Sequence, residues 1–231
     1  LDKRISGDLD FTKVTDKNLE TAGGLRAFVN SSITFINCTF DGDVLAYNTF
    51  KKDDLELFVV TSFSRNLSFI KCNFNGEVNF RDAEIHGSAN FSQSIFYNIA
   101  NFEGTGFYNK NNHFTEAVFK GQARFQRVYF SSDVQFFKTE FSNKTFFQQS
   151  HFGGYVQFSV TKHDDLLNIS DCRIIGDFLM NYAKPDSCRV IIRHSHFFGR
   201  FEMIENKYSI MPAIEHIHIF GKSSFSKSVF P

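Results

Sequence analysis

The sequence has no tryptophan, three prolines, three methionines and four cysteines among its 231 residues. It also has no net charge, because Lys plus Arg and Asp plus Glu both total 25. Proteins that bind nucleic acid normally carry a basic surface, and proteins that imitate nucleic acid carry an acidic one. The balanced charge argues against both classes, and we predict no nucleic-acid partner.

Two further features are missing. There is no tract of twenty apolar residues, the length that a membrane-spanning helix needs. The chain opens LDKRISGDLDF, without an initiator Met or a signal-like apolar run. We therefore expect a piece of a longer protein, predict no membrane span in this segment, and assign no compartment to it.

What the sequence has in excess is phenylalanine, with 32 residues. Large residues recur in alternating steps of five and six, and each is Phe except Ile85, at positions 69, 74, 80, 85, 91, 96, 102 and onward to 158. Two residues before each lies a small or aliphatic residue, with Asn112 as the exception. Residues two apart project from the same side of an extended chain. Each unit therefore supplies one bulky and one small inward side chain.

Glycine follows many of the large residues by two positions, as at Gly76, Gly87, Gly121, Gly154 and Gly176. Glycine tolerates the positive φ that a sharp chain reversal often needs, so we expect these residues at corners with positive φ. A short extended face followed by a tight corner, repeated many times, predicts a solenoid.

The segments FRDAEIHGSANFSQSIF (80–96) and FTEAVFKGQARFQRVYF (114–130) resemble the pentapeptide-repeat family, in a variant with units of the form F-x-x-A-x-F-x-G-x-A-x. The resemblance implies a bacterial origin and an all-β fold, a right-handed quadrilateral β-helix with about 22 residues per coil and about ten coils. We predict one domain over residues 1–231, with irregular or looped chain at about 12–27, 47–57, 159–168 and 181–190. SITFINCTF precedes the similar NLSFIKCNF by 34 residues, a gap that we interpret as three eleven-residue units plus one inserted residue.

Three of the cysteines, Cys38, Cys72 and Cys172, occupy the small inward position, where a buried thiol acts as a small hydrophobic group. A disulfide is not expected, because Cys38 and Cys72 would lie about one and a half coils apart. Cys188 lies in KPDSC, which looks like a bulge, and it is the thiol that we expect to be reactive. No cysteine spacing resembles a zinc motif.

The histidines form a more regular arrangement. His194 and His196 precede His216 and His218 by 22 residues, one coil, so all four should project outward together. Such a cluster is a candidate metal site for Zn²⁺, Ni²⁺ or Cu²⁺, with Asp171 as a further oxygen donor. The alternative is a polar outward ladder that repeats because the coils repeat.

Beside the histidines, Ile175, Phe198 and Phe220 each follow a large inward residue and should point away from the core. An exposed apolar column usually marks a contact surface. We therefore predict a non-enzymatic scaffold, a rigid rod that binds a protein partner through a side face or its end, with no catalytic residues and no cofactor. A homodimer through the C-terminal end is a second form of contact. The alternatives are a ligand- or metal-binding surface module and a DNA-mimic inhibitor of a topoisomerase.

Overall fold

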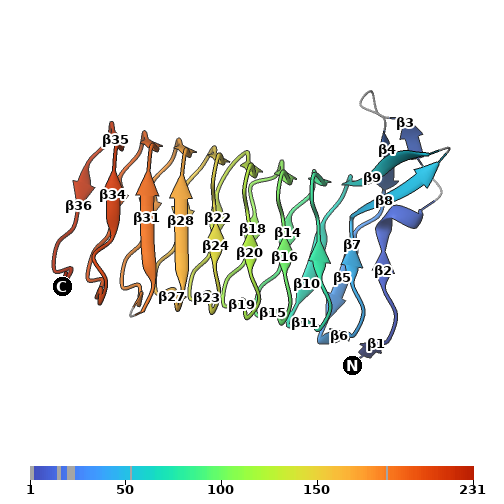
Figure 1. Cartoon of the computed structure of the whole chain (residues 1–231), viewed down its shortest axis with the longest axis horizontal. Coiled ribbons are helices and arrows are strands. Elements are labelled where there is room, and N and C mark those ends of the chain that lie inside the picture. Colours follow the sequence, from blue (N-terminus) through green and yellow to red (C-terminus); the bar gives the residue numbers. More distant parts are fainter. Residues whose placement is uncertain (1–2, 15–16, 20–23, 53, 186) are drawn as a thin grey trace.

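The chain winds into a four-sided rod in which short parallel strands stack from the N-terminal to the C-terminal end (Figure 1). The structure is a computed structural model, and it describes residues 3–14, 17–19, 24–52, 54–185 and 187–231. Each side of the rod is one β-sheet, and the chain passes through sheets D, A, B and C in each coil. The predicted all-β quadrilateral β-helix is confirmed.

The strands of the four sheets are as follows. Sheet A contains β1 (Lys3–Ile5), β6 (Cys38–Phe40), β11 (Asn73–Phe74), β15 (Ile95–Phe96), β19 (Val118–Phe119), β23 (Glu140–Phe141) and β27 (Lys162–His163). Sheet B contains β2 (Leu9–Asp10), β7 (Val44–Leu45), β12 (Val78–Asn79), β16 (Ala100–Asn101), β20 (Ala123–Arg124), β24 (Thr145–Phe146), β28 (Leu166–Ser170), β31 (Arg189–Arg193) and β34 (Ala213–Glu215). Sheet C contains β3 (Lys17–Leu19), β4 (Gly24–Val29), β8 (Tyr47–Lys52), β9 (Leu55–Phe63), β13 (Glu84–Ile85), β17 (Gly106–Phe107), β21 (Tyr129–Phe130), β25 (His151–Phe152), β29 (Arg173–Ile174), β32 (His196–Phe197) and β35 (His218–Ile219). Sheet D contains β5 (Ile33–Ile36), β10 (Leu67–Ile70), β14 (Ala89–Asn90), β18 (Asn112–His113), β22 (Val134–Gln135), β26 (Val156–Gln157), β30 (Phe178–Leu179), β33 (Phe201–Glu202) and β36 (Ser223–Ser224). A 3-10 turn, η1 (Phe11–Lys13), follows β2.

The predicted count of about ten coils is too high, since the described strands number seven in sheet A and nine in each of sheets B and D. The reason lies near the N-terminus, where Ile33 pairs with Leu67, so that 34 residues make one coil. The additional residues of this coil include the antiparallel hairpin of β8 and β9, which projects from the rod (Figure 1). The interpretation of this 34-residue gap as three short units was therefore wrong.

The other stretches expected to be irregular differ among themselves. Residues 12–27 hold η1, the antiparallel pair β3–β4 and several residues outside the described ranges. In 159–168 the 22-residue register persists, with Lys162 opposite Glu140 and Leu167 opposite Thr145. Within 181–190, of which residue 186 is not described, one residue is inserted, because Leu167 pairs with Val190.

The interior of the rod consists of phenylalanine rings stacked from coil to coil. Rings one coil apart lie nearly parallel: the centroids of Phe102 and Phe125 are 5.0 Å apart, and those of Phe125 and Phe147 are 4.8 Å apart. Phe125 also meets Phe114 edge to face at 5.4 Å. Each of these rings is fully buried. Burial of a phenylalanine contributes roughly 1.5–3 kcal/mol, and favourable ring pairs add about 0.5–1.5 kcal/mol.

The small inward positions have a second role. Where they hold serine or threonine, the hydroxyl donates to the backbone oxygen of a phenylalanine in the preceding coil, as Thr105 does to Phe80 at 2.7 Å and Ser150 to Phe125 at 2.7 Å. A buried hydroxyl without a partner would be destabilising. These bonds explain why polar residues alternate with alanine and valine in a core of phenylalanine.

The corners are built differently from the prediction. Positive φ occurs at non-glycine residues every eleven or so positions, for example at Asp82 (52°), Glu116 (58°) and Arg127 (53°). They lie in turns such as the one that the Ala83 N–H closes on the Phe80 oxygen at 3.0 Å. Gly104 is the one described glycine with positive φ. The expectation that the other corner glycines need positive φ was wrong.

Glycine is needed at these corners because successive coils approach one another too closely for a side chain. A Cβ added to Gly176 would lie 2.4 Å from the carbonyl carbon of Gly154, and one added to Gly199 would lie 2.5 Å from that of Gly176. Both distances are far below van der Waals contact, and the atoms met are backbone atoms that a rotamer change cannot move.

We expect Phe125→Ala to lower the free energy of unfolding by about 3–5 kcal/mol, because it removes a ring that four others contact. Equilibrium denaturation in urea measures the change. Tyr97→Ala, which truncates an exposed aromatic side chain, is the matched control and should change stability little. A Phe125→Ala variant that unfolds at the same urea concentration as the parent would contradict the stacked core.

Gly176→Ala should destabilise the rod by about 1–3 kcal/mol, as overpacking typically does. Gly7→Ala is the control, since a Cβ there meets nothing within 4 Å. Thermal unfolding of both variants is the measurement. Equal melting temperatures for the two would show that the coils are less tightly stacked at the Gly176 corner than described.

Candidate functional site

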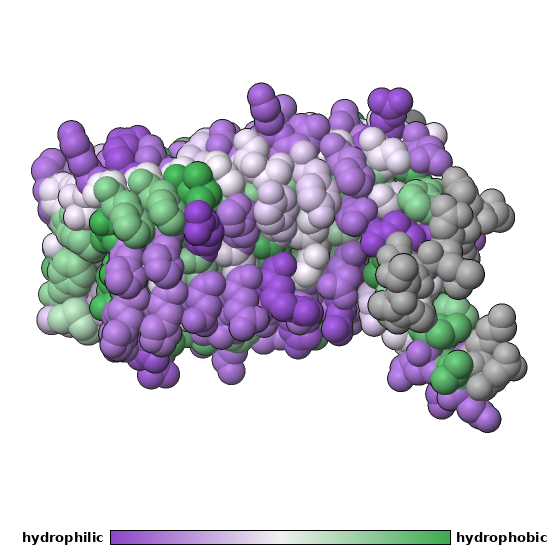
Figure 2. All heavy atoms as spheres, turned by 90° about the horizontal axis from the view of Figure 1, so that it is seen from above, coloured by the Kyte–Doolittle hydropathy of each residue, from purple (hydrophilic) through white to green (hydrophobic). Residues whose placement is uncertain are grey.

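The outward face of sheet C near the C-terminal end carries the predicted apolar column. Ile175, Phe198 and Phe220 directly follow β29, β32 and β35, and the pairing of these strands places them one above another. Ile175 is 37% exposed and Phe220 is 64% exposed. Figure 2, which looks onto the rod from above, shows hydrophobic atoms gathered toward the C-terminal end beside strongly hydrophilic ones. We call these three residues the apolar column.

The two phenylalanines of the apolar column stack on each other outside the core. Their ring centroids are 4.8 Å apart and their planes differ by 9°. The guanidinium carbon of Arg173 lies 4.5 Å from the centroid of Phe198, a cation–π contact. The outward pair therefore repeats the geometry of the buried ladder, with an arginine at one end of it.

The four histidines form two stacked pairs next to the apolar column. His196 and His218 lie opposite each other on β32 and β35, with ring centroids 5.0 Å apart. His194 and His216 are 5.1 Å apart, but they lie at the corner before each strand, with φ of 47° and 52°. The predicted stacking of the pairs is confirmed, whereas the placement of all four on one extended face was wrong.

The predicted carboxylate donor also lies beside the histidines, since an oxygen of Asp171 is 3.8 Å from Nδ1 of His194. Within the described ranges, however, no group of three or more His, Cys, Asp or Glu side chains is placed to hold a metal ion. Rings stacked face to face direct their nitrogen lone pairs in parallel and not toward one point. The structure therefore offers two ring pairs here and no converging ligand set.

The cysteines are all free and all buried. Cys72 and Cys38 are one coil apart, because Asn73 pairs with Thr39, and the estimate of one and a half coils was wrong. Burial raises the pKa of Cys72 to about 11 and that of Cys188 to about 12. A buried thiol with a raised pKa is a poor nucleophile, so the expectation that Cys188 is reactive was also wrong.

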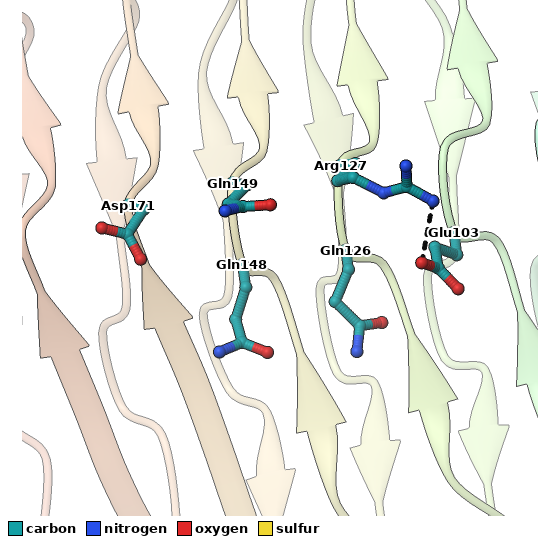
Figure 3. Close-up of a pocket in the computed structure, with 6 residues that line it drawn as sticks. All are labelled: Glu103, Gln126, Arg127, Gln148, Gln149 and Asp171. Atoms are coloured by element: carbon teal, nitrogen blue, oxygen red, sulfur yellow. Dashed lines mark hydrogen bonds and ion pairs between the residues drawn. The ribbon is translucent and has the colours of Figure 1, made fainter.

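A polar hollow lies at the corner between sheets B and C (Figure 3). Its lining residues are Glu103, Gln126, Arg127, Gln148, Gln149 and Asp171. An Nη atom of Arg127 donates to a carboxylate oxygen of Glu103 at 2.9 Å, which pairs the two charges. None of the six is a serine, cysteine, lysine or histidine. The hollow therefore offers hydrogen bonds and not a nucleophile.

Comparison with known protein families agrees with this architecture. The family model described as pentapeptide repeats, with nine copies, matches residues 58–109. These residues belong to the pentapeptide-repeat family. The same strand register continues from this segment through β35, so the pentapeptide-repeat coils extend well beyond the matched residues. No curated protein and no solved structure matches the chain.

No helix among the described residues of this pentapeptide-repeat protein is long and apolar enough to cross a membrane.

One residue of the pentapeptide-repeat core escaped the sequence analysis. His163 takes the place of a phenylalanine in sheet A, 22 residues after Phe141, and its ring stacks on that residue at 5.0 Å. Its side chain is buried, with Nε2 3.0 Å from the Thr161 hydroxyl oxygen. The step of five from Phe158 was the available signal, but the segment had been assigned to a loop.

The environment of His163 opposes its protonation. The Thr161 hydroxyl donates to the Phe158 oxygen, so it accepts from Nε2, and Nδ1 is the unprotonated nitrogen. Nδ1 is buried and has no hydrogen-bond partner in the described part of the chain. Burial lowers the pKa of His163 to about 3, although the nearby carboxylate of Asp164 acts in the opposite direction.

We expect this histidine to make the rod sensitive to acid. Because the pKa of His163 is depressed in the folded state, the unfolded chain binds the additional proton, and stability falls as the pH drops from about 6.5 toward 3. Between pH 7 and pH 5 the loss should be about 2 kcal/mol. Urea denaturation across this range measures it.

His163→Phe, which restores the ring ladder, should remove that part of the pH dependence. His113→Gln, a substitution at a less buried histidine of sheet D, is the control and should retain it. Identical slopes for the parent and His163→Phe would contradict the buried neutral histidine.

Proposed function

We propose that the chain is a non-enzymatic interaction scaffold that binds a protein partner through the sheet C face at its C-terminal end. The observation that carries this proposal is the stacked pair of Phe198 and Phe220 on the outside of the rod. Phenylalanine is otherwise used here to fill the interior, and an exposed cluster of aromatic and aliphatic side chains is typical of a docking surface.

The rigidity of the rod supports the same proposal. The apolar column is held by strands that pair with the coils before and after them, and its backbone turns at a column of closely stacked glycines. Side chains on such a frame lose little conformational freedom on binding, which favours affinity. The pentapeptide-repeat fold also devotes its recurring positions to the core, which agrees with a scaffold and with the absence of enzymatic activity that we propose.

The predicted homodimer through the C-terminal end stays a prediction. In the last described coil Phe225 is 39% exposed and Phe230 is 38% exposed. These side chains lie at the end of the stack, whereas the apolar column lies on its side, so the two contacts can be tested separately.

The proposal is tested with Phe198→Ser/Phe220→Ser as bait in affinity capture from the source cells, against the parent chain. Tyr97→Ser/Tyr182→Ser is the matched control, because it removes two exposed aromatic side chains at other corners. We expect a protein that the parent and the control recover and the double phenylalanine variant loses by at least tenfold. The same set of proteins from all three baits would contradict a docking role for this face.

A further inference from the structure

A ladder of flat side chains runs along sheet C beside the apolar column. Tyr129, His151, Arg173, His196 and His218 occupy the same outward position on β21, β25, β29, β32 and β35, each paired with the next. Tyr129 stacks on His151 at 5.0 Å and 9°, and His196 stacks on His218 at 5.0 Å and 8°. We call these five residues the ring ladder.

The ring ladder has cationic and titratable basic groups and no carboxylate. Arg173 lies at its centre, and no carboxylate oxygen of the described residues lies within 4 Å of its guanidinium group. Its charge is felt along the ladder, since burial and then the Arg173 charge lower the pKa of His151. An arginine with a free fork of N–H donors is suited to bind a carboxylate.

The acidic residues closest to the ladder in sequence are already engaged. Asp171 lies 3.8 Å from His194, and an oxygen of Glu215 lies 3.1 Å from Nε of Arg193. The uncompensated charge of this face is therefore positive, and it adjoins the apolar column. A ligand that complements both needs negative charge next to an apolar group.

The ring geometry favours a polypeptide over a sugar chain as that ligand. The stacking partners of Phe198 are Arg173 and Phe220, so the faces of its ring are taken up within the protein. The outward edges carry the positive part of the aromatic quadrupole and attract carboxylates. A sugar that binds an aromatic residue by stacking needs an open ring face, which Phe198 does not offer.

We propose that this face binds an acidic protein segment, with an apolar side chain of the segment on the apolar column and its carboxylates on Arg173, His196 and His218. This inference rests on the proposed docking function and names the chemistry of the partner. Aspartate or glutamate near a phenylalanine, tyrosine or leucine is the sequence pattern that the partner should carry.

The test measures binding of defined polymers to the immobilised chain by biolayer interferometry at low ionic strength. The probes are a random copolymer of glutamate and tyrosine, a copolymer of lysine and tyrosine, and alginate as an anionic polysaccharide. We expect the glutamate–tyrosine copolymer to bind at least tenfold more tightly than either of the others. Equal binding of alginate would overturn the assignment to a polypeptide, and equal binding of the lysine copolymer would overturn the assignment of charge.

Variants locate the binding on the face. Arg173→Glu and His196→Glu/His218→Glu should each weaken the glutamate–tyrosine copolymer at least tenfold. Arg189→Glu, an equal change of charge at an exposed residue of sheet B, should leave binding unchanged. Melting curves establish that each variant is folded. A loss with Arg189→Glu equal to that with Arg173→Glu would overturn the proposal.

The same assay separates this inference from the proposed function. If Phe198→Ser/Phe220→Ser abolishes binding of the copolymer and Arg173→Glu does not, the docking face stands and the acidic partner is overturned. If both variants bind as the parent does, the face is not the binding site and both proposals fail.

Discussion

Stacking of one phenylalanine ring on another, one coil further along the chain, is the interaction on which this fold depends. A single coil cannot bury its inward side chains, so every ring needs a neighbour above and below. The spacing of hydrogen-bonded strands, about 4.8 Å, agrees with the ring spacing of 4.8–5.0 Å along the Phe102, Phe125 and Phe147 column. Backbone hydrogen bonds and aromatic packing are therefore satisfied by the same rise, and neither has to yield to the other.

The same rise governs the outer surface. Two residues that project outward one coil apart are brought to about the same separation as two core rings, as His196 and His218 or Phe198 and Phe220 are. A solenoid thus turns a sequence period into straight columns of side chains. The single inserted residue between Leu167 and Val190 is absorbed without loss of register in β31, which keeps the ladder on sheet C continuous. Function in such a rod resides in these columns, because the interior is filled.

The inward ladder and the outward columns could be predicted because a bulky side chain in a fixed place leaves a period in the sequence. The corners could not. The residues with positive φ include Asp82, Gln93 and Glu116, whose types share no signal, while the glycines that do recur are required by the approach of the next coil. The N-terminal coil was misread because a hairpin of 47–63 contains strand-like residues that do not join the inward ladder. His163 was missed because a histidine was not expected to replace a buried ring.

The most direct test of the account is the network of ring-to-ring nuclear Overhauser effects in a chain labelled only at phenylalanine. We predict cross-peaks that join Phe102 to Phe125 and Phe125 to Phe147, rings that are neighbours in space and more than twenty residues apart in sequence. Removal of the Phe125 ring should erase both. Cross-peaks confined to phenylalanines that are close in sequence would contradict the stacked interior.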